Sequence, residues 1–256
     1  MTEKVRSLIG ICATVALIAL VISLLALDRS RERTMECKGV KAVVTDSARL
    51  SFISEADVIA NTVHFCPYTG KKAIEMDLQG IERYLEEKSA IRDCEAYIDR
   101  QGYVNLVVRQ REPVIRFQKG KRGFYADKSG YLFPLQPSYT SRVPIIDGDI
   151  PLEAGEGFQG RPDNPVERQW LERIIGMVSY MEETGWSSLI SQVTVLGNGD
   201  LELIPAEGKE RFIFGSPTAL KAKFGRIDTY YASIAPANNA YTSVDVRYDK
   251  QIICKK

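Results

Sequence analysis

The chain has 256 residues, 45% of them hydrophobic and 26% charged, and its formal net charge is +1. These values are ordinary for a folded protein, and they argue against a dedicated nucleic-acid binder, which usually carries a concentrated basic surface. The sequence contains one histidine, His64, so any histidine-based triad or zinc site would have to use that residue alone. We therefore expect that the protein binds no metal or cofactor and is not an enzyme. We interpret His64 as a partly buried histidine beside the structural Cys66.

Residues 8–27 form a run of twenty residues without a charge, which as a helix would be about 30 Å long and would match a bilayer's hydrocarbon core. We predict an uncleaved transmembrane helix there, with a tail at 1–7 and a charged spacer at 28–37. A cleaved signal peptide is less favoured because no small-x-small cleavage site follows the run, and a lipoprotein anchor at Cys12 because bulky Ile11 precedes the cysteine. Lysine and arginine counts leave the orientation open.

Four cysteines follow the predicted span, and their even number suits an oxidising compartment. They are Cys37, Cys66, Cys94 and Cys254. Their spacings fit no zinc motif and do not determine any disulfide pairing.

The first part of the folded chain has the order β-α-α-β-β. Residues 40–46 read as a strand and 54–63 as a helix that begins at a Ser-x-x-Asp capping box. Residues 77–88 read as a second helix with one apolar face. The segments "CEAYID" and "YVNLVVRQ" alternate apolar and polar residues, which is typical of two strands of a hairpin.

The second part reads as strands and two one-sided helices. "NPVE" begins a helix with an asparagine cap and a proline in its first turn, and Gly185 ends it. "QVTVLGNGDLELI" indicates a hairpin around an Asn-Gly turn, and "ERFIFGS" another strand. Ser216-Pro217 is expected to cap a second helix. Residues 155–165 are expected to be a flexible surface loop. Helices with one apolar face beside a strand set predict an antiparallel sheet with helices on one face.

This order, directly after a single membrane span, resembles the FtsQ/DivIB cell-division family. "VVRQREPVIRF" is similar to the family's strand that leads into an Arg-Glu-Pro step, and "GFYADKSGYLFPL" to the hairpin that follows it. "RVPIIDG" and "VDVRYDKQIICK" are similar to later strands of the family. The resemblance implies an α+β protein with a POTRA-like (polypeptide-transport-associated) domain at 38–117 and an FtsQ-like β domain at 118–256.

The C-terminal segment is the candidate functional site. Val244, Val246 and Tyr248 alternate with charged residues as in a half-buried strand, and a further apolar stretch ends the chain. An edge strand leaves backbone groups unpaired, and few charges and no proline protect this one. Such an edge can accept an incoming strand, although it could also be a plain edge.

The resemblance implies how this edge is used. In FtsQ-like proteins the last strands receive a strand from FtsB, a small single-span coiled-coil protein that pairs with FtsL. Arginine and tyrosine are common interface residues, and Arg247 and Tyr248 fall on family positions that contact the partner. The candidate partner-binding residues are Arg247, Tyr248, Lys250, Gln251, Ile252, Ile253 and Cys254.

The resemblance also implies a non-enzymatic inner-membrane scaffold at the division septum, with a cytoplasmic N-terminus and a periplasmic C-terminal domain. A membrane-anchored envelope enzyme, such as a carboxylate-based glycan hydrolase, is the alternative. It would need two carboxylates facing one cleft, about 5 to 10 Å apart, and the sequence indicates no such pair. An outer-membrane translocation protein is disfavoured, because no long run of barrel strands follows the POTRA-like region.

Overall fold

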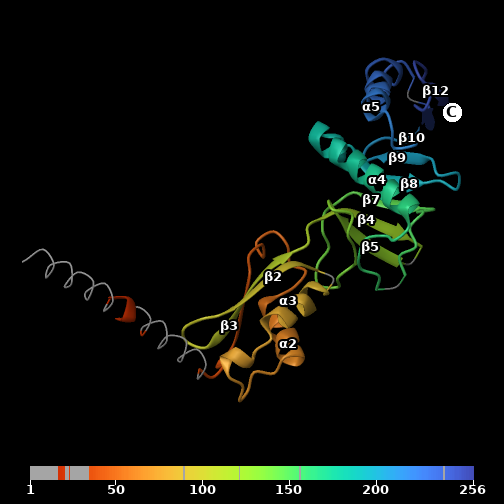
Figure 1. Cartoon of the computed structure of the whole chain (residues 1–256). Helices are drawn as coiled ribbons and strands as arrows, with labels where there is room; N and C mark the ends of the chain where they lie inside the picture. The colour runs from red at the N-terminus through yellow and green to blue at the C-terminus, as the bar shows by residue number, and fades with distance from the viewer. Residues whose placement is uncertain are drawn as a thin grey trace, which may run out of the picture. The chain divides into compact units, whose positions relative to one another are not determined.

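The computed structural model describes residues 17–20, 23, 35–88, 90–120, 122–155, 157–238 and 240–256. The predicted tail and most of the predicted span and spacer lie outside these residues. Within the described ranges, no helix is both long enough and apolar enough to cross a bilayer. The chain divides into two compact units, with the boundary between Gln110 and Arg111 (Figure 1).

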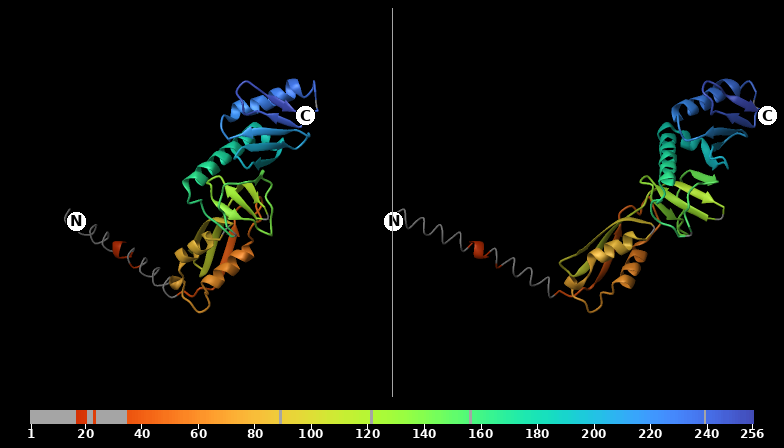
Figure 2. Two further views of the ribbon diagram at one scale, coloured as in Figure 1. Left: turned by 90° about the vertical axis from the view of Figure 1, so that its right-hand side faces the viewer. Right: turned by 45° about the vertical axis from the view of Figure 1, so that its right-hand side comes forward.

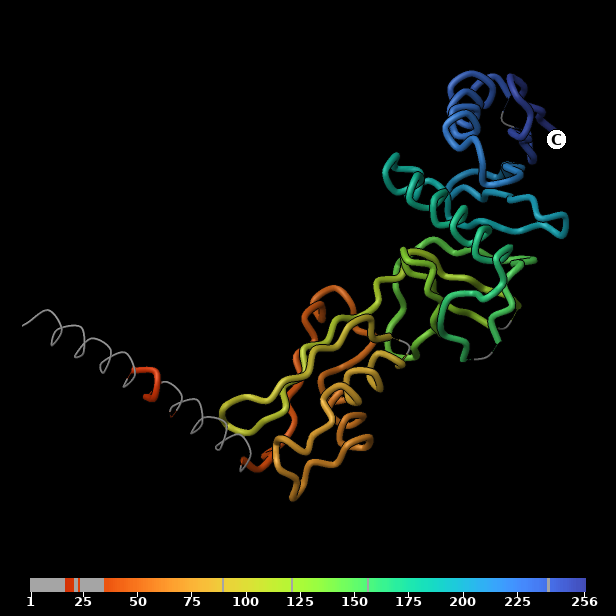
Figure 3. The backbone as a smooth tube through the Cα atoms, viewed as in Figure 1, coloured from red at the N-terminus to blue at the C-terminus, as the bar shows by residue number. Residues whose placement is uncertain are grey.

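The first unit has a small mixed sheet with the strand order β1-β3-β2. Its strands are β1 (Gly39–Val44), β2 (Ile91–Ile98) and β3 (Tyr103–Gln110). β1 is parallel to β3, whereas β2 and β3 form the predicted antiparallel hairpin, which is the long hairpin of Figure 3. β2 is therefore an outer strand of this sheet.

Helices pack on one face of the first sheet. They are α2 (Glu55–Phe65), the short η1 (Ala73–Glu75) and α3 (Leu78–Glu86). The predicted capping box is confirmed, because the Ser54 side chain accepts from the Asp57 N–H and the Asp57 carboxylate accepts from the Ser54 N–H. Val58 on α2 and Leu85 on α3 are fully buried against the strands. The order β-α-α-β-β is confirmed.

His64 does not have its predicted environment. It lies exposed in the last turn of α2, whereas Cys66 just after the helix is buried. The expectation of a partly buried histidine is wrong, because the buried face of α2 passes through Val58 and Thr62 and not through His64.

The second unit has one sheet of nine described strands, in the order β12-β11-β10-β9-β8-β7-β4-β5-β6. The strands are β4 (Pro113–Lys119), β5 (Arg122–Asp127), β6 (Leu132–Pro134), β7 (Ile145–Gly148), β8 (Ile190–Val195), β9 (Leu201–Pro205), β10 (Arg211–Gly215), β11 (Ser243–Asp245) and β12 (Ile253–Lys255). Residues 113–117, predicted within the first domain, lie in β4, which pairs with β5 and β7 of this sheet.

The second sheet is mixed, and the prediction of an antiparallel sheet is wrong. The pairs β4–β7, β7–β8 and β10–β11 are parallel. A helical crossover joins β7 to β8 and another joins β10 to β11, and such crossovers return the chain in the same direction.

The crossover helices supply one side of the core. They are α4 (Pro165–Thr184), followed by η2 (Trp186–Ser188), and α5 (Leu220–Thr229), followed by the π-helical turn η3 (Tyr230–Ile234) (Figure 2). Asn164 caps α4 and Gly185 ends it, as predicted. Met177 of α4 and Phe224 of α5 are buried with the sheet side chains in one continuous core.

The start of α5 differs from the prediction. The helix begins at Leu220 after Ala219, which has a left-handed backbone and makes no side-chain cap. The Ser216 hydroxyl lies 2.8 Å from the Thr218 hydroxyl, and the Ser216 carbonyl accepts from the Lys223 ammonium at 2.6 Å. Ser216 therefore precedes the helix and does not cap it.

Candidate functional site

The two edge strands of the second sheet, β6 and β12, differ in whether another segment bonds to their outer edge. At the β6 end, the Leu132 N–H donates to the Gly160 carbonyl at 2.8 Å, and the Gly160 N–H returns a bond to Leu132 at 2.9 Å. The predicted flexible loop thus includes a residue that covers the outer edge of β6. At the other end, none of the described strands pairs with the outer edge of β12. Such an edge can add another strand.

The hydrogen bonds of β11 show which backbone groups of β12 face outward. The Thr242 carbonyl and the Val246 N–H both bond to β10, at 2.9 and 3.1 Å. Bonding direction alternates along a strand, so Ser243 and Asp245 turn their backbone groups toward β12.

Ser243 and Asp245 lie opposite Lys255 and Ile253 in the register of the β11–β12 pair. The backbone groups of these two β12 residues are therefore used within the sheet. By the same alternation, the N–H and C=O of Cys254 point away from β11, toward the open side. Cys254 is thus the residue through which this edge would bond an added strand.

Side chains along β12 alternate as well. Ile252 and Cys254 are half-buried against the core, whereas Ile253 is 40% exposed and Lys255 is exposed. Burial raises the pKa of the Cys254 thiol, which keeps it protonated at neutral pH. An added strand would therefore meet an apolar surface on the helix side and Ile253 with Lys255 on the other side.

The predicted strand through Val246 and Tyr248 is not formed, because β11 already ends at Asp245, and residues 246–252 form a loop before β12 that presents the other predicted residues. Tyr248 is 48% exposed, and Lys250 and Gln251 are exposed in the turn, where Lys250 has a left-handed backbone with φ of 57°. Arg226 of α5 holds this loop, since its Nε donates to the Val246 carbonyl at 2.9 Å. Its Nη1 also lies 3.6 Å from the Asp249 carboxylate, so Arg226 contacts the loop both at its start and at its turn.

Arg247 makes contacts within the chain. Its Nη1 lies 2.7 Å from the Asp200 carboxylate, and its Nη2 and Nε lie 2.7 and 3.0 Å from the Asp245 carboxylate. Burial opposes ionisation of Asp245, but the hydrogen bonds from Arg247 outweigh it and lower the pKa of that carboxyl. The same bonds raise the pKa of Arg247. We call Arg247, Asp200 and Asp245 the ionic latch.

Gly215 makes room for the ionic latch. A Cβ on Gly215 would lie 2.8 Å from Cγ of Arg247, and the φ of 73° would strain any other residue there. Asp200 follows the Asn-Gly turn and is 47 residues from Arg247 in the chain. The sequence therefore holds no local signal of this contact. Of the predicted site residues, the exposed ones gather at the loop and edge, and Arg247 is already paired.

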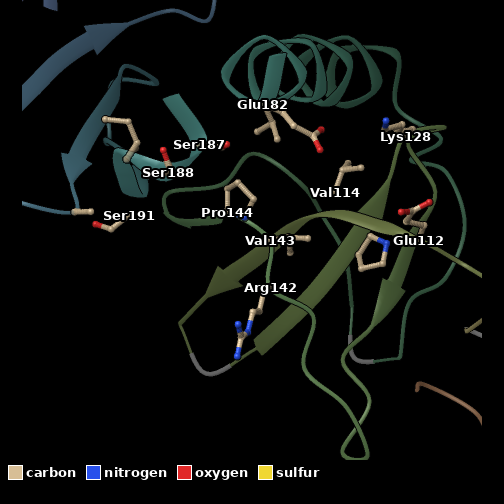
Figure 4. A pocket seen from close by; sticks show the side chains of 14 residues that line it. Glu112, Val114, Lys128, Arg142, Val143, Pro144, Glu182, Ser187, Ser188 and Ser191 are labelled. Carbon is tan, nitrogen blue, oxygen red and sulfur yellow. The ribbon is translucent and has the colours of Figure 1, made fainter. Parts of the chain in front are cut away.

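A groove of about 510 Å³ opens elsewhere in the second unit. Figure 4 shows Glu182 directed from α4 into this groove, opposite Val114 and Pro144. β7 begins at Ile145, opposite Arg116 of β4, so the first residues of β4 have no β7 partner and line the groove.

Two carboxylates of this groove bear on the hydrolase alternative. Glu112 and Glu182 both line it, but both side chains are exposed to solvent. A carboxyl group that acts as a general acid is usually kept protonated by an apolar surrounding, which neither residue has. Among the residues that the structure describes, no group of three or more His, Cys, Asp or Glu side chains could hold a metal ion.

The cysteines are separate thiols. Cys37, Cys66 and Cys94 are buried in the first unit, and Cys254 is half-buried in the second. Burial, followed by the charges of Glu82 and Glu86, raises the pKa of Cys94 to about 12. No disulfide joins these four residues in this structure.

Comparison with known proteins agrees with the architecture of both units. A family described as "FtsQ/DivIB, C-terminal related" matches residues 112–255, and a POTRA-like domain matches residues 35–109. No match was found among curated proteins. The two matched domains indicate a protein related to cell division or to the cell envelope, of a type that is typically a non-enzymatic scaffold. The chain belongs to the FtsQ/DivIB C-terminal-related family and carries a POTRA-like domain before that family's domain.

Proposed function

We propose that this protein is a single-span inner-membrane scaffold of the division machinery, which binds FtsB- and FtsL-like proteins by adding a partner strand to β12. Its N-terminus lies in the cytoplasm, its two folded units lie in the periplasm, and it concentrates at the septum. Anchoring in the membrane raises the effective concentration of membrane-bound partners near the edge. The family match and the open edge of β12 support this proposal.

The observation that carries the proposal is the difference between the sheet's ends. Gly160 covers β6 with two backbone hydrogen bonds, whereas β12 has no such cover among the described strands. Exposed edges are usually protected, because unpaired backbone groups promote unwanted association. An edge left open beside exposed Tyr248 and Ile253 is suited to a partner.

The side chains around β12 indicate the chemistry of the partner strand. Lys250, Lys255 and Lys256 are exposed around the edge. A strand that alternates apolar residues with aspartate or glutamate would place its apolar side chains beside Ile252 and its carboxylates near the lysines. Tyr248 would add contact area at the loop. The ionic latch holds the loop in place for this contact.

Capture from membranes tests the proposal. Tagged full-length protein is compared with Cys254→Pro, which removes the outward N–H, and with Cys254→Val, which keeps it. A version ending at Asp249 lacks β12 altogether. We expect small single-span coiled-coil proteins with wild type and Cys254→Val, and a loss of at least about tenfold with Cys254→Pro and the truncation. Circular dichroism checks that all four fold.

Equal capture by Cys254→Pro and Cys254→Val, with both variants folded, would contradict strand addition at β12. Partners that still bind the truncated chain would place the contact elsewhere, such as in the POTRA-like unit. Failure of every version to bring down such proteins would contradict the scaffold itself.

A further inference from the structure

Side chains of a helix close the free edge of β2, one of the two outer strands of the first sheet. The Cys94 N–H donates to the Glu86 carboxylate at 3.1 Å, and the Ala96 N–H donates to the Glu82 carboxylate at 2.8 Å. Both N–H groups belong to β2, whose other edge pairs with β3. Two glutamates of α3 therefore occupy donors that an incoming strand would otherwise bond.

The spacing of the two elements explains the match. Glu82 and Glu86 are four residues apart on α3, which is about 6 Å along a helix axis. Cys94 and Ala96 are two residues apart on β2, which is about 6.8 Å along a strand. The two carboxylates, one helical turn apart, therefore have nearly the spacing that the carbonyl oxygens of a neighbouring strand would have. Charged acceptors also make stronger hydrogen bonds than neutral ones.

Glu95 adds a second barrier against self-pairing. It lies between the two capped residues and is exposed on the face away from the helices. If β2 paired antiparallel with β2 of a second copy, with Cys94 opposite Ala96, the two Glu95 side chains would face each other. Like charges directly opposite one another destabilise a strand pair.

We infer that Glu82 and Glu86 are specificity-determining residues that close the β2 edge to strand addition, and that β2 pairs with β2 of a second copy of this chain once Glu95 is removed together with them. The inference deepens the proposed function, because a scaffold that receives its partner at β12 gains from closing other edges. It is tested without the partner, so its failure is distinct from failure of the scaffold proposal.

The test uses the full chain in detergent micelles and compares wild type, Glu82→Ala/Glu86→Ala and Glu82→Gln/Glu86→Gln, each with and without Glu95→Ala. The glutamine variant loses both charges but keeps an amide oxygen that can accept the same bonds. Hydrogen exchange measures the protection of the Cys94 and Ala96 amides. Light scattering, corrected for the micelle, measures the mass of the protein. Single alanine variants are included in case the double variant does not fold.

We expect the variant that combines Glu82→Ala, Glu86→Ala and Glu95→Ala to dimerise with a twofold mass, whereas wild type, Glu95→Ala alone and the glutamine variants stay monomeric. In the single variants, Glu86→Ala should speed exchange at Cys94 and Glu82→Ala at Ala96, each by about tenfold, the effect of losing one hydrogen bond. Unchanged exchange in the single variants would overturn the closure. A folded triple alanine variant that stays monomeric would overturn the pairing of two copies.

Discussion

Arg111 and Asp127 form a nearly buried ion pair, with the Arg111 Nη1 donating to the Asp127 carboxylate at 3.2 Å. The guanidinium also lies 3.5 Å from the centre of the Tyr131 ring. The same carboxylate accepts from the N–H groups of Ser129 and Tyr131 and from the Ser129 hydroxyl, which shapes the turn. The Arg-Glu-Pro step and the Asp-x-x-Gly turn, which the sequence presents as two separate motifs, are thus one structural unit.

This pair predicts unequal effects of its two alanine variants. Asp127→Ala removes the carboxylate that pairs with the buried Arg111 guanidinium, whose Nε already has no hydrogen-bond partner. We therefore expect the free energy of unfolding to fall by about 3–5 kcal/mol. Arg111→Ala should cost less, because Asp127 keeps its three donors in the turn. Both tryptophans, Trp170 and Trp186, lie in the second unit, so their fluorescence during urea unfolding of residues 35–256 reports on it. Equal losses would contradict this account of the pair.

The ionic latch predicts that Asp200 affects partner binding without touching the partner. Asp200→Ala should reduce capture as Arg247→Ala does, since each releases the loop before β12. The cost to folding should be only about 0.5–1 kcal/mol, because the pair is partly exposed and screened by solvent. Parallel capture assays with both variants give the answer. Loss of capture with Arg247→Ala alone would instead indicate that Arg247 contacts the partner directly.

For Tyr248 we predict a small effect on folding stability and a large effect on partner binding. Its ring is about half exposed, so Tyr248→Ala should leave the unfolding free energy within about 0.5 kcal/mol of wild type. If it is an interface residue, the same change should weaken partner binding by about 2 kcal/mol or more. Titration of a partner peptide by calorimetry measures the second effect. Tyr248→Phe, which keeps the ring, serves as the control and should retain most of the affinity.

We predict that replacing Gln110 destabilises the first unit. Its side-chain oxygen accepts from the N–H groups of Phe52 and Ile53, and its nitrogen donates to Asp46 and to the Leu50 carbonyl. Gln110→Ala should cost about 2–4 kcal/mol, because it leaves buried donors unpaired. Gln110→Glu should cost more, since it places a carboxylate against two acceptors. Hydrogen exchange at Phe52 and Ile53 reads the change, and slow exchange in both variants would contradict it.

The raised pKa of Cys94 leads us to predict a loss of stability at alkaline pH. Burial and the glutamates of α3 raise its pKa in the folded chain to about 12, above the value of about 8.5 in an unfolded chain. Folding thus favours the protonated thiol, and its contribution is complete below about pH 8.5 and is lost as the pH rises toward 12. Cys94→Ala should unfold with a shallower decline between pH 8.5 and 11. A decline equal to that of wild type would show that Cys94 does not contribute.

Local sequence signals predicted the elements that depend on neighbours in the chain. The capping box at Ser54, the asparagine cap of α4 and the Asn-Gly hairpin are each determined by contacts over a few residues. Alternation of apolar residues likewise predicted the β2–β3 hairpin. The strand direction in the second sheet was not predictable in this way, because apolar periodicity does not distinguish parallel from antiparallel pairing.

The sequence by itself determined that a strand passes through Val244 and that an apolar stretch follows it, since both patterns are local, although the strand ends at Asp245 and does not reach Tyr248. Only the tertiary structure decided what Arg247 does, because Asp200 comes from a hairpin 47 residues away. It also decided which edges are closed, because Gly160 covers β6 and the glutamates of α3 cover β2 from other parts of the chain. Contacts between distant segments depend on how the strands are ordered, and no residue pattern along the chain records that order.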